Sequence, residues 1–314
     1  MRRFYHHQNT GLLICVAHLL AATTASCLGG APASDMAAWR NPDRPIEERI
    51  NKLMGQLNES EKISLLYWLA PPVDRLRMPE YHHGNECLHG LVRPGKNTVF
   101  PQAIGLAATF DPDLVHEMAT AISDEARARW NESGGKHLGL YSDVLTLWSP
   151  VVNMARDPRW GRTQETYGED PWLTSRMGVA FVKGLQGDDP HFLKVVSTPN
   201  HCAGNNQESG RFGKNVLCDQ RYLFEYELFP FRACTTEGKA QSIMGAYTAI
   251  NGVPSSANKW LLTDVLRGKW HFGGYVVSDC GAVSHVVDAF HYANTPEAAI
   301  AASPGDSTCG ASSK

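Results

Sequence analysis

The chain has 314 residues, of which 43% are hydrophobic and 19% are charged, and its formal net charge is −3. This balance supplies enough apolar side chain for a full core and excludes a disordered protein, a collagen and a coiled coil. The sequence contains no surplus or block of lysine and arginine, so we expect no nucleic-acid partner.

The first 33 residues have the pattern of a secretory signal peptide. Arg2 and Arg3 precede an apolar run over 11–22, and small residues that include Ala-Pro-Ala at 31–33 follow it. The run is too short to cross a bilayer, so we expect an exported protein with no membrane span. Cys27 is a candidate lipid-attachment site, and a buried N-terminal helix is the structural alternative to export.

Helices and short apolar strands alternate along the rest of the chain. Helical patterns, several with capping residues or an early proline, cover residues 46–69, 111–129, 170–184, 220–237, 258–269 and 295–302. Short strands are predicted at 145–149, 195–198, 242–246 and 275–278.

This alternation predicts βα units and a parallel sheet. Roughly 280 residues follow the signal, which suits one (β/α)8 barrel of about 250 residues. A doubly wound sheet is the alternative, but the sequence has neither a G-x-G-x-x-G nor a Walker phosphate loop. We therefore predict an α/β fold, with a single TIM-type barrel over 34–302.

Polar segments follow the predicted strands, where a barrel places its reacting groups. Asp279 ends the last strand and could be a nucleophile, a metal ligand or a cap of the next helix. Residues 149–170 mix arginines and carboxylates with Trp160 and Tyr167, a composition that suits a ligand with many hydroxyls. A solvated loop with internal ion pairs is the alternative for that segment.

Three further segments carry polar groups near strand ends or turns. His201 follows the strand at 195–198, Glu86 and His89 share one turn, and Tyr247 follows the strand at 242–246. His82, His83, Cys87 and His89 are close in sequence but match no metal-ligand spacing, and no C-x-x-C pair exists. We expect no metal site.

Taken in chain order, these segments resemble the N-terminal barrel domain of glycoside hydrolase family 3. The resemblance runs from about Arg40 to about Ala302. It rests on six motifs: Asn-Glu-x-Leu-His-Gly, Phe-Pro-Gln, Arg-Asp-Pro-Arg-Trp-Gly-Arg with Glu-Thr-Tyr-Gly-Glu-Asp-Pro, the His201 segment, Met-x-x-Tyr, and Val-Ser-Asp-x-Gly-Ala. Family members are exo-acting, retaining β-glycosidases, chiefly β-glucosidases and β-xylosidases. The resemblance implies hydrolysis of terminal non-reducing β-D-glycosyl residues without a metal or organic cofactor.

Residue by residue, the resemblance implies one catalytic and five substrate-binding positions. Asp279 matches the nucleophile, and the residues that match sugar contacts or neighbours of the nucleophile are Glu86, Arg162, Asn200, His201 and Tyr247. Asn200 stands where the family has the lysine of a Lys-His pair. The Glu86 motif is more similar to the xylosidase branch, and glucoside and xyloside substrates both stay open.

The implied mechanism is double displacement, in which Asp279 forms a covalent glycosyl-enzyme that water then hydrolyses. Two-domain family members take the acid/base carboxylate from a second domain that follows the barrel. Here residues 303–314 replace the Lys-Ala-Gly strand that the family has at this point. We therefore expect a barrel that is incomplete at its last strand, an irregular tail and no second domain. The functional alternative is a truncated, non-catalytic sugar-binding remnant.

Overall fold

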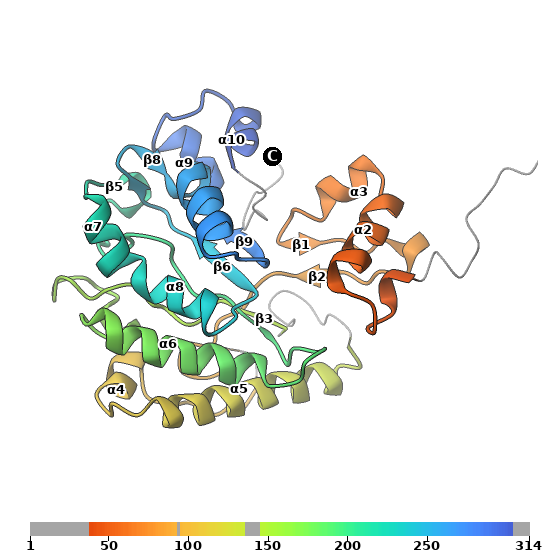
Figure 1. The fold of residues 1–314 in the computed structure, drawn as a ribbon, viewed down its shortest axis with the longest axis horizontal. Helices are drawn as coiled ribbons and strands as arrows, with labels where there is room; N and C mark the ends of the chain where they lie inside the picture. Colours follow the sequence, from red (N-terminus) through yellow and green to blue (C-terminus); the bar gives the residue numbers. More distant parts are fainter. Residues whose placement is uncertain (1–37, 93–94, 136–144, 304–314) are drawn as a thin grey trace, which may run out of the picture.

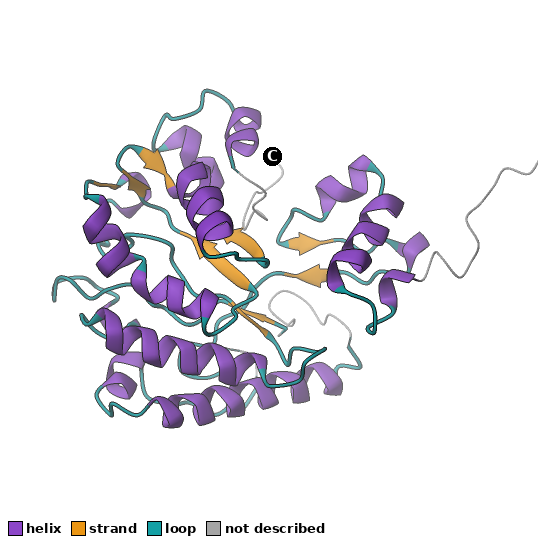
Figure 2. Cartoon of the chain, viewed as in Figure 1, coloured by secondary structure: helices purple, strands orange, loops and turns teal. Residues whose placement is uncertain are grey.

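The computed structural model of the chain describes residues 38–92, 95–135 and 145–303. The predicted signal at 1–33, with Cys27, and the tail from residue 304 onward lie outside the described residues, so export and lipid attachment stay predictions. In the described part, helices surround a set of short strands (Figure 2). None of the helices described there is long and apolar enough to cross a membrane.

Four parallel strands form the centre of the fold, and all four match the sequence prediction. They are β3 (Thr146–Leu147), β4 (Val196–Ser197), β6 (Ser242–Gly245) and β9 (Tyr275–Ser278). β3 pairs with β4 and β6 pairs with β9, both in parallel. A parallel bridge from Val151 to Asn200 extends the β3–β4 pair, and one from Cys202 to Gly245 connects the segment after β4 with β6. The order across the sheet is therefore β3-β4-β6-β9, and the four carboxyl ends share one edge.

The predicted α/β class is confirmed, whereas a closed barrel is not seen among the described residues. The N-terminal strands β1 (Leu69–Ala70) and β2 (Tyr81–His82) pair with each other in antiparallel fashion and add no parallel strand to the sheet. Beside β3, Trp148 N–H donates to the Asn85 carbonyl at 2.6 Å. The four strands β3, β4, β6 and β9 form an open parallel sheet in the part of the chain that the structure describes.

Helices α5 (Pro112–Glu132) and α6 (Pro171–Gln186) run side by side along one border of the molecule (Figure 1). Each has an aspartate cap followed by proline, as the sequence predicts. The side chains that the two helices bury include Ile122, Met177 and Phe181, all fully buried. Gly184 permits the close approach, because a Cβ there would lie 2.4 Å from the His116 carbonyl oxygen.

The predicted helix at 220–237 exists but has three parts. They are α7 (Gln220–Tyr222), a π-helical segment η5 (Leu223–Glu227) and α8 (Phe229–Thr236). Pro230 has no N–H to donate, and its ring would clash with the carbonyl four residues earlier, so the helix widens ahead of it. The predicted helix at 258–269 is likewise π-helical, as η7 (Trp260–Lys269).

The remaining elements are short. The predicted helix at 46–69 is split into α2 (Ile46–Gln56) and α3 (Glu59–Ser64), with the expected capping box between Asn58 and Glu61. The others are α4 (Ala103–Ala107), β5 (Asn215–Val216), β7 (Ala249–Ile250), β8 (Val253–Pro254), α9 (Ala282–Asp288) and α10 (Pro296–Ala302). β5 pairs with β7 in parallel, and β7 forms an antiparallel hairpin with β8.

Candidate active site

Asp279 lies at the carboxyl end of β9, directly after the strand. Its N–H donates to the Gly245 carbonyl at 3.2 Å, so the β6–β9 ladder fixes its backbone. The residue is 9% exposed, and its Oδ1 accepts a hydrogen bond from Cys280 N–H at 2.7 Å. α9 begins with Gly281 as its cap and has no side-chain cap. The interpretation of Asp279 as a helix cap is therefore wrong.

His201 follows β4 and is held by Asn153. Asn153 Oδ1 accepts from the His201 backbone N–H at 2.8 Å, and Asn153 Nδ2 donates to the His201 carbonyl at 2.8 Å. The same Oδ1 lies 3.0 Å from Nδ1 of the imidazole. Because an amide oxygen only accepts, we assign the ring proton to Nδ1, which leaves Nε2 as an acceptor.

The other ring nitrogen of His201, Nε2, faces Asp279 and accepts a hydrogen bond from Arg162. Nε2 lies 3.7 Å from Oδ2 of Asp279 and 3.4 Å from Nη1 of Arg162. Burial lowers the pKa of His201 well below its usual value, and the positive charges of Arg162 and Arg211 lower it further. His201 is therefore a neutral group that can accept a hydrogen bond from a ligand hydroxyl.

Two arginines supply positive charge to this group of residues. Arg162, from the loop after β3, donates through Nε and Nη2 to Glu165 at 2.8 and 2.6 Å, which turns Nη1 toward His201. Arg211, from the loop after β4, is paired with Glu208 at 2.6 Å. Its guanidinium lies over the Tyr247 ring, 5.1 Å from the centroid.

Burial raises the pKa of Asp279 to about 6. The Cys280 N–H and the charges of Arg162 and Arg211 act in the opposite direction, by favouring the carboxylate. The side chain is consequently mostly ionised at neutral pH and mostly protonated at pH 5.

Tyr247 follows β6 and is the fourth residue of this group. Its hydroxyl donates to the Cys280 carbonyl at 2.6 Å and so supports the turn that follows Asp279. Burial and the nearby charge of Asp279 raise the pKa of Tyr247 above its usual value, so the phenol keeps its proton. Phe212 and His285 pack against the ring, with centroids 4.8 and 5.3 Å away.

The structure brings four predicted site residues together: Asp279, Arg162, His201 and Tyr247. Asn200 is 3% exposed, and its Nδ2 donates to the Trp148 carbonyl at 2.9 Å. Glu86 is exposed and lies at the same edge of the sheet, one residue after the Asn85–Trp148 backbone contact. The roles of these residues toward a substrate stay predictions.

Sequence reasoning missed Asn153 and Arg211. Asn153 lies within the motif-rich segment after β3, but nothing in the pattern says that its amide holds a histidine from another loop. Arg211 stands in an ordinary Gly-Arg-Phe sequence, and only the folded loop places it over Tyr247. Among the described residues, no three His, Cys, Asp or Glu side chains gather as metal ligands.

Comparison with known proteins identifies the chain's relatives. Residues 73–303 match the model of the glycosyl hydrolase family 3 N-terminal domain. Beta-D-xylosidase 3 of Arabidopsis thaliana is 39% identical over 291 residues, which cover 87% of this chain and 37% of the relative. Xylan 1,4-beta-xylosidase of Xylanibacter ruminicola is 36% identical over 272 residues, which cover 84% of this chain and 31% of the relative.

Solved structures give the same result. The family 3 exo-beta-xylosidase XlnD, solved with a xylobiose aziridine probe, aligns with a TM-score of 0.77 and 34% identity over 86% of this chain and 36% of its own. A family 3 beta-glucosidase of Bifidobacterium adolescentis aligns with a TM-score of 0.69 and 30% identity over 82% of this chain and 35% of its own. The chain thus spans little more than a third of these relatives, yet the family model matches most of the chain. The chain belongs to glycoside hydrolase family 3.

Proposed function

We propose that this chain carries the glycone-binding and nucleophilic part of a retaining exo-β-glycosidase. The observation that carries the proposal is Asp279, a buried carboxylate at the carboxyl end of a parallel strand. Its Oδ2 lies 3.7 Å from the neutral imidazole of His201, and two arginines supply charge nearby. Such a group can bind the hydroxyls of a terminal sugar and offer an ionised oxygen to its anomeric carbon.

The proposed reaction has two displacements. An oxygen of Asp279 attacks the anomeric carbon, the bond from that carbon to the leaving oxygen breaks, and an acid donates a proton to the leaving oxygen. Water then attacks the same carbon, the conjugate base takes a proton from that water, and the Asp279 carboxylate departs. Each displacement inverts the configuration at the anomeric carbon, so the two together retain it. Arg162 Nη1 and Arg211 would donate to sugar hydroxyls, and His201 Nε2 would accept from one.

The acid is not one of the residues grouped around Asp279. The neutral imidazole of His201 donates its Nδ1 proton to Asn153 Oδ1, and the Tyr247 hydroxyl donates its proton to the Cys280 carbonyl. Neither proton is therefore available to the leaving oxygen. In two-domain family members this acid comes from a second domain, and the chain spans little more than a third of the relatives it matches. We infer that the described site carries out the first displacement and depends on another group for proton transfer.

We propose a β-xyloside as the preferred substrate. Glu86 lies in an Asn-Glu-x-Leu-His-Gly motif that is similar to the xylosidase branch, and both curated relatives described above are named as xylosidases. Glu86 follows Asn85, whose carbonyl accepts from Trp148 N–H next to the end of β3, and its carboxylate would accept hydrogen bonds from the outer hydroxyls of the sugar.

An activated substrate tests the nucleophile without requiring the acid. A dinitrophenolate leaving group needs little protonation, so 2,4-dinitrophenyl β-xyloside should release a burst of about one dinitrophenolate per chain. Intact-protein mass spectrometry should show the mass of one xylosyl group added at Asp279. Asp279→Asn should abolish both signals. Asp288→Asn, which changes an exposed aspartate of α9, should keep them.

Sugar binding without turnover is the second candidate, and one observation favours it. Asn200 places a neutral amide, bound to the Trp148 carbonyl, where the family has a lysine. The site therefore lacks one cationic donor for the sugar and one charge that would keep Asp279 ionised. Calorimetric binding of xylose or glucose, with no burst and no covalent adduct, would favour this candidate over the glycosidase.

A further inference from the structure

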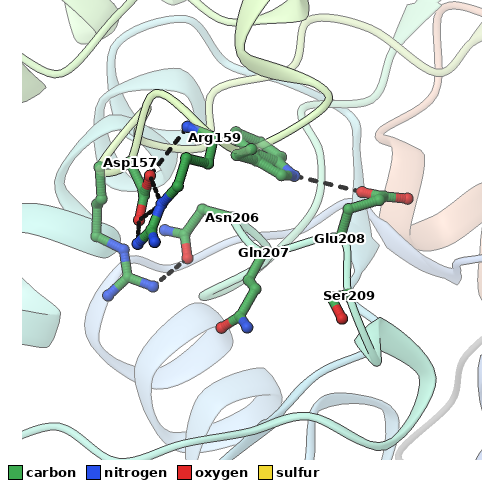
Figure 3. Close-up of a pocket in the computed structure, with 8 residues that line it drawn as sticks. Asp157, Arg159, Asn206, Gln207, Glu208 and Ser209 are labelled. Atoms are coloured by element: carbon green, nitrogen blue, oxygen red, sulfur yellow. Dashed lines mark hydrogen bonds and ion pairs between the residues drawn. The ribbon is translucent and has the colours of Figure 1, made fainter.

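Three side-chain contacts join the loop after β3 to the loop after β4. The first loop carries Arg162, and the second carries His201 and Arg211. The contacts advance along both loops in the same direction, so they hold the two loops in register. In chain order they join Asn153 to His201, Arg156 to Asn206 and Trp160 to Glu208. The last four of these residues line a cavity of about 540 Å³ between the two loops (Figure 3).

The middle contact is fixed by a carboxylate from a third segment. Glu227 lies in η5 and has no exposed surface. Its Oε1 accepts hydrogen bonds from Asn206 Nδ2 at 2.8 Å and from Tyr222 Oη at 2.7 Å. Arg156 donates to Asn206 Oδ1 and, at 2.9 Å, to Tyr222 Oη. Its Nε lies 3.4 Å from Glu227 Oε1, so the carboxylate balances the charge of Arg156 on the cavity wall. These four side chains form a closed ring of hydrogen bonds, here called the Glu227 ring.

Stability alone does not account for Glu227. Taking a carboxylate out of water costs free energy, and a buried ion pair often adds nothing to stability compared with apolar side chains of the same volume. Oε2 of Glu227 is buried too, and it accepts no hydrogen bond from the described residues. What the ring supplies is direction, because its donors and acceptors hold their partners in one geometry that an apolar contact would not impose.

The Glu227 ring holds each loop close to residues of the candidate active site. Arg156 lies six residues before Arg162 in the first loop, and Asn206 lies midway between His201 and Arg211 in the second. Arg162 Nη1 is 3.4 Å from His201 Nε2, so a slip of one loop against the other would separate this pair. A displacement of about 1 Å at reacting groups can slow a reaction on the order of a hundredfold.

We propose that Glu227 is a positioning residue for the glycosidase reaction, because it holds the two loops in the register that places Arg162 and His201 beside the nucleophile. The inference rests on the proposed function and deepens it. Glu227 does not act on the sugar, since its hydrogen bonds go to other members of the Glu227 ring. Changing it should therefore affect the rate of the chemical step and not the number of working sites.

Burst kinetics on the full chain with 2,4-dinitrophenyl β-xyloside test the inference. The rate constant of the burst measures how well the folded site is arranged, whereas the amplitude counts folded sites. Glu227→Gln keeps the shape of the side chain and one acceptor but removes its charge. The variant should still fold, because the Arg156 side chain is 34% exposed and water can solvate its charge. The burst rate constant should fall at least about tenfold, with an amplitude that stays near one per chain.

Tyr222→Phe is a second variant, which breaks the Glu227 ring without changing any charge. It removes only the hydroxyl that joins Arg156 to Glu227, and it should lower the burst rate constant about threefold. The double variant with Glu227→Gln should be no slower than Glu227→Gln alone, because both changes break the same ring. Effects that multiply in the double variant would mean that the two side chains act independently, which would overturn the inference.

Glu225→Gln is the matched control. Glu225 lies in the same segment η5 and is also paired with an arginine, Arg221 at 2.9 Å, but its side chain is 64% exposed. The control should leave rate and amplitude unchanged. An unchanged rate constant in Glu227→Gln, a loss of amplitude alone, or an equal loss of rate in Glu225→Gln would overturn the inference while the proposed function stands. If the parent chain gives neither a burst nor a covalent adduct, the proposed function fails and the inference fails with it.

Discussion

In the proposed reaction Asp279 attacks a sugar as a charged carboxylate, and the structure buries this carboxylate. Burial raises its pKa to about 6, and the Cys280 N–H and two arginines limit the shift. The folded protein therefore binds a proton at Asp279 more tightly than the unfolded chain does. This difference makes the stability of the protein depend on pH.

We expect Asp279→Asn to stabilise the protein at neutral pH. Well below pH 4 the carboxyl is protonated in both the folded and the unfolded state, so an amide gains nothing there. Between about pH 4 and pH 6 the unfolded chain loses this proton while the folded protein keeps it, so the folded state loses stability, and the loss levels off above pH 6. The resulting cost, which the amide avoids, approaches something on the order of 2–3 kcal/mol. An amide oxygen also still accepts from Cys280 N–H.

Urea unfolding from pH 4 to pH 8 measures this effect. The gain in unfolding free energy for Asp279→Asn should be smallest at the acid end, should grow between pH 4 and pH 6 and should level off above pH 6. A variant that is less stable than the parent at pH 7, or a difference that does not change with pH, would contradict the assigned burial of the charge. A loss of glycosidase activity together with a gain in stability is the expected pattern for a residue kept for function.

At the scale of elements, the packing of α5 against α6 depends on one glycine. A Cβ at residue 184 would lie 2.4 Å from the His116 carbonyl oxygen and 2.8 Å from the Ala119 Cβ. Both contacts are closer than real Cβ atoms approach, and the first is with backbone that cannot rotate away. Ser123 Oγ also donates to the Gly184 carbonyl at 3.1 Å, so the two helices are joined at this level.

Gly184→Ala should therefore destabilise the fold although alanine favours helices. The two helices would have to separate, at a cost of about 1–3 kcal/mol. Gly55→Ala in α2 is the matched control, because nothing lies within 4 Å of a Cβ there. The control should gain up to about 1 kcal/mol from helix propensity. Thermal unfolding of both variants measures the difference, and a gain in both would show that the α5–α6 contact is looser than described.

At the scale of the whole molecule, the parallel sheet assembles the site. Arg162, His201, Tyr247 and Asp279 each follow a different strand, in the order β3, β4, β6 and β9. Because parallel strands share one carboxyl edge, four distant segments deliver their side chains to one place. The same packing determines which side chains solvent can reach.

The reactivity of the cysteine thiols can be used to measure this burial. The five that the structure describes are thiols; Cys87, Cys202 and Cys234 are buried, Cys218 is half-buried and Cys280 is exposed. Burial raises the pKa of Cys87 to about 12 and raises the pKa values of Cys202 and Cys234 as well. Only a thiolate reacts readily, so these three should resist alkylation.

Brief treatment of the native chain with iodoacetamide should therefore modify Cys280 first and Cys218 more slowly. Peptide mass spectrometry measures the extent at each position, and the same treatment in urea should modify all five described cysteines. Rapid modification of Cys87 or Cys234 under native conditions would mean that the core opens more easily than the described packing allows.

The sequence predicted the elements well because their signals are local. The capping box at Asn58, the aspartate-proline starts of α5 and α6, and the strand before Asp279 all depend on neighbours within a few residues. The β7–β8 hairpin is not among the predicted elements, although its Asn251-Gly252 turn carries an equally local signal, since both residues have positive φ. The motif pattern also named four of the residues that meet at the site.

Only the tertiary structure decided the chemical state of those residues and the shape around them. The proton position on His201 depends on Asn153, the pKa of Asp279 depends on burial, and the charge balance of the cavity depends on Glu227. The absence of barrel closure among the described strands is likewise a matter of which segments pair. Sequence alone determined the four parallel strands, the positions of most of the longer helices and the family motifs. Ionisation, hydrogen bonding and cavity shape needed the fold, because they arise between segments that are distant in the chain and meet only when it is folded.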